Sequence, residues 1–236
     1  MKKFVGSLLG FVVISFSAQA NDASCLPCST SNEGLSKMAM NTILQSPTCL
    51  KRAGDESNEA IVEKNKLTDF ELLARLTFAE GISTNMEKCA KYGASVYESI
   101  AWGVYSRVEL AAKNPRYAQS FGKGYRGVIF KKAQFNPAVS KKSSYSKLFL
   151  CPTEHPKWKT YWQHATSAAN KILVEGKKSP FTKAPTHFYY PQSSQATQPP
   201  VAWADLTKGK AQKAYLKGVK IDGNAFSNEC VQFFAY

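Results

Sequence analysis

A single acidic residue stands on a helix face that is otherwise apolar. Leu73, Leu76 and Glu80 are three and four residues apart, so they share one face of an α-helix, and the leucines indicate that this face points inward. Burial and the negative end of the helix dipole both raise the pKa of a carboxyl group placed there. A carboxylic acid still protonated near neutral pH is suited to general acid catalysis. The same pattern fits a structural glutamate paired with Arg75 or Arg107, and the pattern alone does not decide.

Aromatic residues lie beside hydroxyl and amide side chains in two other segments. Residues 186–190 read Thr-His-Phe-Tyr-Tyr, and residues 134–136 read Gln-Phe-Asn. Aromatic faces beside hydrogen-bonding groups suit sugar rings, which have apolar faces and hydroxyl edges. Alternate residues of a strand also pack into a core, so a structural role fits the same aromatics. We expect His187 to be a hydrogen-bonded structural residue rather than a base. The candidate substrate-binding residues are Gln134, Phe135, Asn136, Thr186, His187, Tyr189, Tyr190 and Trp203.

The helix that carries Glu80 has a clear start signal. Thr68 and Glu71 form a capping box, with Thr68 as the N-cap and Glu71 three residues later. Glu71 lies on the helix face opposite Glu80, and we expect it to take part in capping the N-terminus of the helix. We expect the helix to end at Glu80, because Gly81 is a natural stop.

The rest of the ordered region is mainly helical with a small β component. Apolar spacing and breaker residues predict helices over about 95–113, 158–175 and 204–216. The aromatic run 186–190 predicts a strand, and 127–130 is a short apolar segment of undecided type. The expected fold class is α+β.

The first twenty residues have the pattern of a cleavable signal peptide. Lys2 and Lys3 precede an apolar stretch over 4–16, and residues 18–20 read Ala-Gln-Ala. The apolar stretch is shorter than the roughly 20 residues of a membrane span. An uncleaved anchor is the alternative. We expect no transmembrane segment, a mature protein that begins near Asn21 and is soluble, and a periplasmic or secreted location.

Six cysteines follow the signal peptide, an even number in an oxidising compartment. Disulfide bonds are therefore expected, and the sequence does not choose among the roughly 15 pairings that six cysteines allow. Cys25 and Cys28 form a CxxC that we interpret as structural. No second CxxC and no histidine pair with ligand spacing is present, and no nucleophile elbow, HExxH or phosphate loop occurs, so we expect no metal and no cofactor.

The chain is strongly basic, with a formal charge of +14. Removal of the two signal-peptide lysines leaves 29 basic and 17 acidic residues, a charge of about +12. This charge favours polyanions, which outside the cytoplasm are lipid head groups, nucleic acid or wall polymer. A solvated basic surface with no specific partner fits the charge as well.

Residues 73–81 resemble the opening motif of the SleB-type cell wall hydrolases, also called spore cortex-lytic enzymes. In that motif the glutamate of an Ala-Glu pair, here Glu80, is the catalytic acid. Later family motifs are similar, in order, to 100–108, 134–136, 184–190, Trp203 and 221–226. Ser106 stands where the family has Asn, and Asn224 where it has His. The resemblance covers about residues 67–226.

The resemblance implies a lysozyme-like fold with a small β-sheet, stapled in this chain by disulfides. The signal-peptide pattern covers 1–20, and the polar, Cys-bearing composition of 21–66 indicates an irregular, Cys-containing N-terminal extension. The resemblance implies a catalytic domain at 67–236. It also implies cleavage of the β-1,4 bond between N-acetylmuramic acid and N-acetylglucosamine in peptidoglycan. Family members are described as lytic transglycosylases, in which one glutamate serves first as acid and then as base.

Three alternatives remain open. One is a secreted, disulfide-stapled inhibitor or structural protein on a lysozyme-like scaffold, since a fold does not determine a function. A hydrolytic lysozyme, or muramidase, would need a second carboxylate about 5–10 Å from the first, and the candidates are Glu87, Glu98, Glu154 and Asp205. A non-catalytic cationic envelope-binding protein would need no core-facing acid. We expect peptidoglycan glycan strands as the partner, no nucleic acid, and a monomer.

Overall fold

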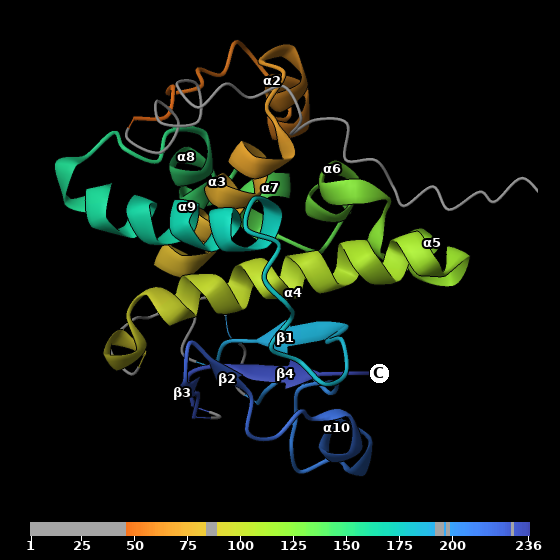
Figure 1. Ribbon diagram of the computed structural model, residues 1–236. Helices are drawn as coiled ribbons and strands as arrows, with labels where there is room; N and C mark the ends of the chain where they lie inside the picture. The colour runs from red at the N-terminus through yellow and green to blue at the C-terminus, as the bar shows by residue number, and fades with distance from the viewer. Residues whose placement is uncertain (1–45, 84–88, 192–195, 197–198, 228) are drawn as a thin grey trace, which may run out of the picture.

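The computed structural model (Figure 1) describes residues 46–83, 89–191, 196, 199–227 and 229–236. The predicted signal peptide, the two cysteines of the CxxC and Glu87 lie outside these residues.

Helices make up most of the described chain, and the strands are short. The α-helices are α2 (Asn58–Lys64), α3 (Asp69–Ser83), α4 (Ala94–Lys113), α5 (Pro115–Phe121), α6 (Gly124–Ile129), α7 (Asn136–Val139), α8 (Ser144–Leu150), α9 (Lys159–Leu173) and α10 (Gly209–Ala214). Two 3-10 turns, η1 (Ala90–Tyr92) and η2 (Pro156–Trp158), precede α4 and α9. The strands are β1 (His187–Tyr189), β2 (Lys220–Ile221), β3 (Asn224–Ala225) and β4 (Gln232–Phe234). The α+β, mainly helical class is confirmed.

The long helix α4 lies between a helical layer and a small sheet (Figure 1). Helices α3 and α9 pack on it and on each other. On the other side β1 pairs antiparallel with β4, so that Phe188 lies opposite Phe233. Gly103 of α4 allows the close approach of β1, since a Cβ there would lie 2.4 Å from the Phe188 ring. This contact fixes the position of the aromatic segment beside the helices.

Helix α3 begins as predicted. The Thr68 hydroxyl accepts a hydrogen bond from the backbone N–H of Glu71 at 3.2 Å, which caps the helix. The Glu71 carboxylate accepts bonds from the buried Arg75 side chain, at 2.9 Å from Nε and 2.6 Å from Nη2. Arg75 is thus the ion-pair partner of Glu71.

The predicted end of α3 at Gly81 is wrong, because the helix continues to Ser83. A Cβ at Gly81 would lie 2.3 Å from Cε1 of the buried Tyr97 ring in α4. Glycine therefore serves here to let α4 pack closely against α3 rather than to stop the helix. Glu80 remains within the last turn.

Residues 46–66 belong to the same core as the later helices, although the sequence indicated an irregular extension. Ile61 and Val62 of α2 are buried in that core. The Asn58 amide donates to the carbonyl oxygen of Pro137 at 3.1 Å. A disulfide joins Cys49 to Cys151, which ties this segment to the end of α8.

A second disulfide joins Cys89 to Cys230. It links the segment that leads from α3 to α4 with the residues just before β4. The two pairs confirm disulfide bonding for four of the six cysteines.

The other predicted elements have mixed outcomes. The helix at 95–113 is confirmed as α4, the helix at 158–175 as η2 and α9, and the strand as β1. The helix predicted over 204–216 is shorter, because the Asp205 carboxylate accepts the Thr207 N–H at 3.0 Å and holds a turn before α10. The apolar segment 127–130 lies largely in α6. Within the described residues, no helix has both the length and the apolar character that crossing a membrane requires.

Candidate functional site

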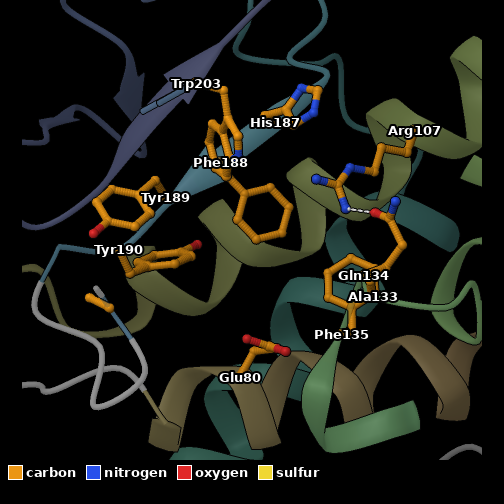
Figure 2. Close-up of a pocket in the computed structure, with 11 residues that line it drawn as sticks. Glu80, Arg107, Ala133, Gln134, Phe135, His187, Phe188, Tyr189, Tyr190 and Trp203 are labelled. Atoms are coloured by element: carbon orange, nitrogen blue, oxygen red, sulfur yellow. Dashed lines mark hydrogen bonds between the residues drawn. The ribbon is translucent and has the colours of Figure 1, made fainter. Parts of the chain in front are cut away.

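A pocket of about 320 Å³ lies where α3, α4 and β1 meet (Figure 2). Helix α3 contributes Glu80 and α4 contributes Arg107, which lie on different sides of the opening. The turn before α7 forms another wall, and the aromatic segment at β1 faces α3. The described residues that line the pocket are Glu80, Arg107, Ala133, Gln134, Phe135, His187, Phe188, Tyr189, Tyr190, Ala196 and Trp203.

Glu80 has the proton affinity expected of a general acid. Burial raises its pKa from an ordinary value of 4.5 to about 7, and the Arg107 charge lowers it by a smaller amount. The carboxyl group is thus close to half protonated at neutral pH. The predicted rise in the pKa is confirmed. Among the described residues that line the pocket, Glu80 is the one carboxylate.

Arg107 is a buried guanidinium held by neutral groups. Its Nε donates to the carbonyl oxygen of Thr186 at 2.9 Å, and Nη1 donates to the side-chain oxygen of Gln134. Three aromatic rings surround its Cζ atom, with the Phe188 centroid nearest at 4.9 Å. Burial lowers the pKa of Arg107 to about 10, so the side chain is a cation at neutral pH.

His187 is neutral at physiological pH. Burial, and secondarily the nearby Arg107 charge, lower its pKa to about 4. Its Nδ1 is hydrogen-bonded to the Thr186 hydroxyl at 2.9 Å, and its ring lies 5.0 Å from the Trp203 ring. These contacts agree with the expected structural role.

Tyr190 presents a neutral phenol close to Glu80. The Ser99 hydroxyl donates to the carbonyl oxygen of Val96 at 2.6 Å, so in the 3.2 Å contact between Ser99 and Tyr190 the phenol is the donor. Burial raises the pKa of Tyr190 far above its usual range. The phenol oxygen therefore keeps its lone pairs for acceptance and does not ionise.

The structure brings most of the predicted site residues together. Glu80, Gln134, Phe135, His187, Tyr189, Tyr190 and Trp203 all line the pocket. Two do not belong to the described lining: Thr186 is buried behind it and holds Arg107, and Asn136 begins α7. The pocket is also lined by four residues that were not predicted from the sequence as site residues, namely Arg107, Ala133, Phe188 and Ala196. For Arg107 a signal existed, because a charged residue three positions after Val104 falls on the inward face of its helix.

The described candidates for a second carboxylate lie elsewhere. Glu98 is buried in α4, where it pairs with Lys171 and accepts from Trp102 Nε1 at 3.2 Å. Asp205 is engaged with Thr207, which lowers its pKa, and Glu154 is exposed. None of the three lines the pocket that contains Glu80. Within the described residues, no three His, Cys, Asp or Glu side chains gather in a way that would hold a metal ion.

No protein-family model, curated protein or solved structure matches the chain.

Proposed function

We propose that this protein cleaves peptidoglycan glycan strands at the β-1,4 bond between N-acetylmuramic acid and N-acetylglucosamine, as a lytic transglycosylase with Glu80 as its acid and base. The observation that carries the proposal is a carboxyl group with a pKa of about 7 in a pocket walled by aromatic side chains. The resemblance of residues 73–81 to the SleB-type motif supports the same residue and reaction. The resemblance also supports a lysozyme-like fold, and the signal-peptide pattern of residues 1–20 supports export from the cytoplasm.

The first step is proton donation. Protonated Glu80 gives its proton to the glycosidic oxygen, and the bond from that oxygen to C1 of the muramic residue breaks. N-acetylglucosamine leaves with a free 4-hydroxyl, and positive charge develops at C1 and the ring oxygen. The Glu80 carboxylate formed in this step carries the opposite charge and stabilises the charge that develops on the sugar.

The second step returns the proton. The Glu80 carboxylate takes the proton of the muramic 6-hydroxyl, whose oxygen attacks C1 and closes a 1,6-anhydro ring. Glu80 ends protonated as it began, and no water is consumed. One carboxylate suffices for this cycle, whereas hydrolysis by a retaining or inverting route uses two. The single carboxylate of the described pocket lining favours the one-acid route.

The aromatic wall supports the sugar assignment. Tyr189 and Trp203 pack edge to face, with ring centroids 5.9 Å apart, and both border the pocket. Neutral His187 and Tyr190 offer hydrogen bonds without competing with Glu80 for its proton.

The test is the digestion of insoluble peptidoglycan by Glu80→Gln. Glutamine keeps the size of the side chain but transfers no proton, so the rate should fall by at least about 10²-fold. Glu109→Gln is the matched control, since it removes the same charge from an exposed pair with Lys113 and should leave the rate unchanged. Wild-type activity should be lost as the pH rises above about 7. Full activity in a well-folded Glu80→Gln protein would contradict the proposal.

A further inference from the structure

Arg107 is a buried charge whose hydrogen-bond acceptors are neutral. Its Nε and Nη1 bonds go to a backbone carbonyl and to an amide oxygen. Three aromatic rings also surround it, with centroids 4.9 to 5.5 Å from its Cζ atom. Figure 2 shows the guanidinium directed toward the pocket. One terminal nitrogen is bonded to Gln134, and the other terminal nitrogen points away from Gln134. The side chain is therefore held in place by these contacts at the wall of the pocket.

The charge of the pocket depends on the proton of Glu80. His187 is neutral because its pKa is about 4, and burial keeps the phenols of Tyr189 and Tyr190 protonated. Glu80 itself is in the acid form when it is ready to donate. In that form Arg107 is the one charged group among the described residues that line the pocket. A buried cation without a counter-charge is unfavourable, and an anionic group on a ligand supplies the counter-charge.

We propose that Arg107 is a specificity-determining residue that binds an acidic substituent of the sugar in the pocket. This inference rests on the proposed function and narrows its substrate class. In N-acetylmuramic acid the acidic group is the lactyl carboxylate, which is free only where no peptide is attached. The preferred substrate is therefore a peptide-free glycan strand. A peptide-bearing strand has an amide carbonyl at the same position. A guanidinium forms a weaker hydrogen bond to this neutral oxygen than it forms to the oxygen of a carboxylate.

Binding of the acidic group is coupled to the proton of Glu80. The Arg107 charge lowers the pKa of Glu80, and a bound carboxylate offsets that charge. The ligand thus favours the protonated form of Glu80, and by reciprocity protonated Glu80 favours the acidic ligand. The preference for an acidic ligand should be strongest below pH 7 and weaker above it.

The experiment measures binding of two disaccharides by calorimetry. Both carry N-acetylglucosamine joined to the 4-oxygen of N-acetylmuramic acid, a linkage other than the one cleaved, so neither is consumed. In one disaccharide the lactyl group carries a free carboxylate. In the other the same carboxyl group is converted to a neutral methylamide. At pH 6 the acid should bind at least about tenfold more tightly, as expected for hydrogen bonds to a charged group. In Glu80→Gln, which mimics the protonated state, this ratio should stay constant from pH 6 to pH 8.5, whereas in the wild type it should fall.

Variants of Arg107 test the residue directly. Arg107→Met should abolish the preference, and Arg107→Lys should keep part of it. Lys113→Met, at the exposed end of the same helix, should leave it unchanged. If Arg107→Met does not fold, the ratio of the two affinities is measured against pH in the wild type and in Glu80→Gln. A ratio that falls with pH in the wild type and stays constant in Glu80→Gln supports the inference, and the same pH dependence in both proteins contradicts it.

The failures of the inference and of the proposed function are distinguishable. Equal affinity for the two disaccharides, or a preference that persists in Arg107→Met, would overturn the inference about Arg107. The proposed cleavage of peptidoglycan would not be affected by either result. If neither disaccharide bound and the wild type did not cleave peptidoglycan, the proposed function would fail and the inference with it. If neither bound although the wall was cleaved, the inference alone would fail.

Discussion

The buried carboxyl group of Glu80 should make the protein less stable as the pH rises from about 4.5 to about 7. In this window the folded state holds the Glu80 proton more tightly than the unfolded state, because the pKa is about 7 when folded and near 4.5 when unfolded. The free energy of unfolding therefore decreases as the pH rises through the window. The difference between the two pKa values corresponds to about 3 kcal/mol, or about 2 to 3 kcal/mol once the partial exposure of Glu80 is considered.

The variant Glu80→Gln has no ionisable group at this position. Comparing its stability with that of the wild type at each pH therefore isolates the contribution of the Glu80 proton. The free energy of unfolding of Glu80→Gln minus that of the wild type should increase by about 2 to 3 kcal/mol between pH 4 and pH 8. Urea denaturation followed by circular dichroism at several pH values gives this difference, and any constant effect of the amide cancels. For Glu109→Gln the corresponding change should be a few tenths of a kcal/mol, since an exposed ion pair contributes little. A flat difference for Glu80→Gln would refute the raised pKa and with it the argument for a general acid.

Three further predictions concern packing, disulfides and wall binding. Gly103→Ala should lower the free energy of unfolding by about 1 to 3 kcal/mol and reduce activity, because its Cβ would clash with the Phe188 ring. Gly209→Ala is the control: no atom lies within 4 Å of its Cβ, so stability and activity should not change. Replacing Cys49 and Cys151 together by serine should cost about 2 to 5 kcal/mol in urea denaturation, and no loss would show that the bridge is dispensable. Pelleting with insoluble peptidoglycan should weaken as salt rises, whereas salt-independent pelleting would show that stacking on sugar dominates.

Local patterns were enough to identify Glu80 as the candidate acid. The spacing of Leu73, Leu76 and Glu80 reports on one helix alone, and the structure buries both leucines in the core and places Glu80 at the pocket. The capping role of Thr68 and the strand at 187–189 are local in the same sense. In each case neighbours along the chain determine the outcome.

Features that depend on contacts between distant segments were missed or left open. Gly81 is a stop signal in isolation, but the ring of Tyr97 from another helix makes it a packing position. Arg107 meets Gln134 and Thr186 only after the chain has folded. The disulfide pairing likewise depends on which segments of the folded chain are adjacent, which the spacing of the cysteines does not encode.

The most direct test of the account is mass spectrometry of the fragments released from purified peptidoglycan. The wild type should release fragments that end in 1,6-anhydro-muramic acid, lighter by one water than fragments with reducing ends. Glu80→Gln should release neither kind, and Glu109→Gln should match the wild type. Anhydro ends that persist in a folded Glu80→Gln protein, or no fragments from the wild type, would contradict the assignment of Glu80 as the acid and base of a lytic transglycosylase.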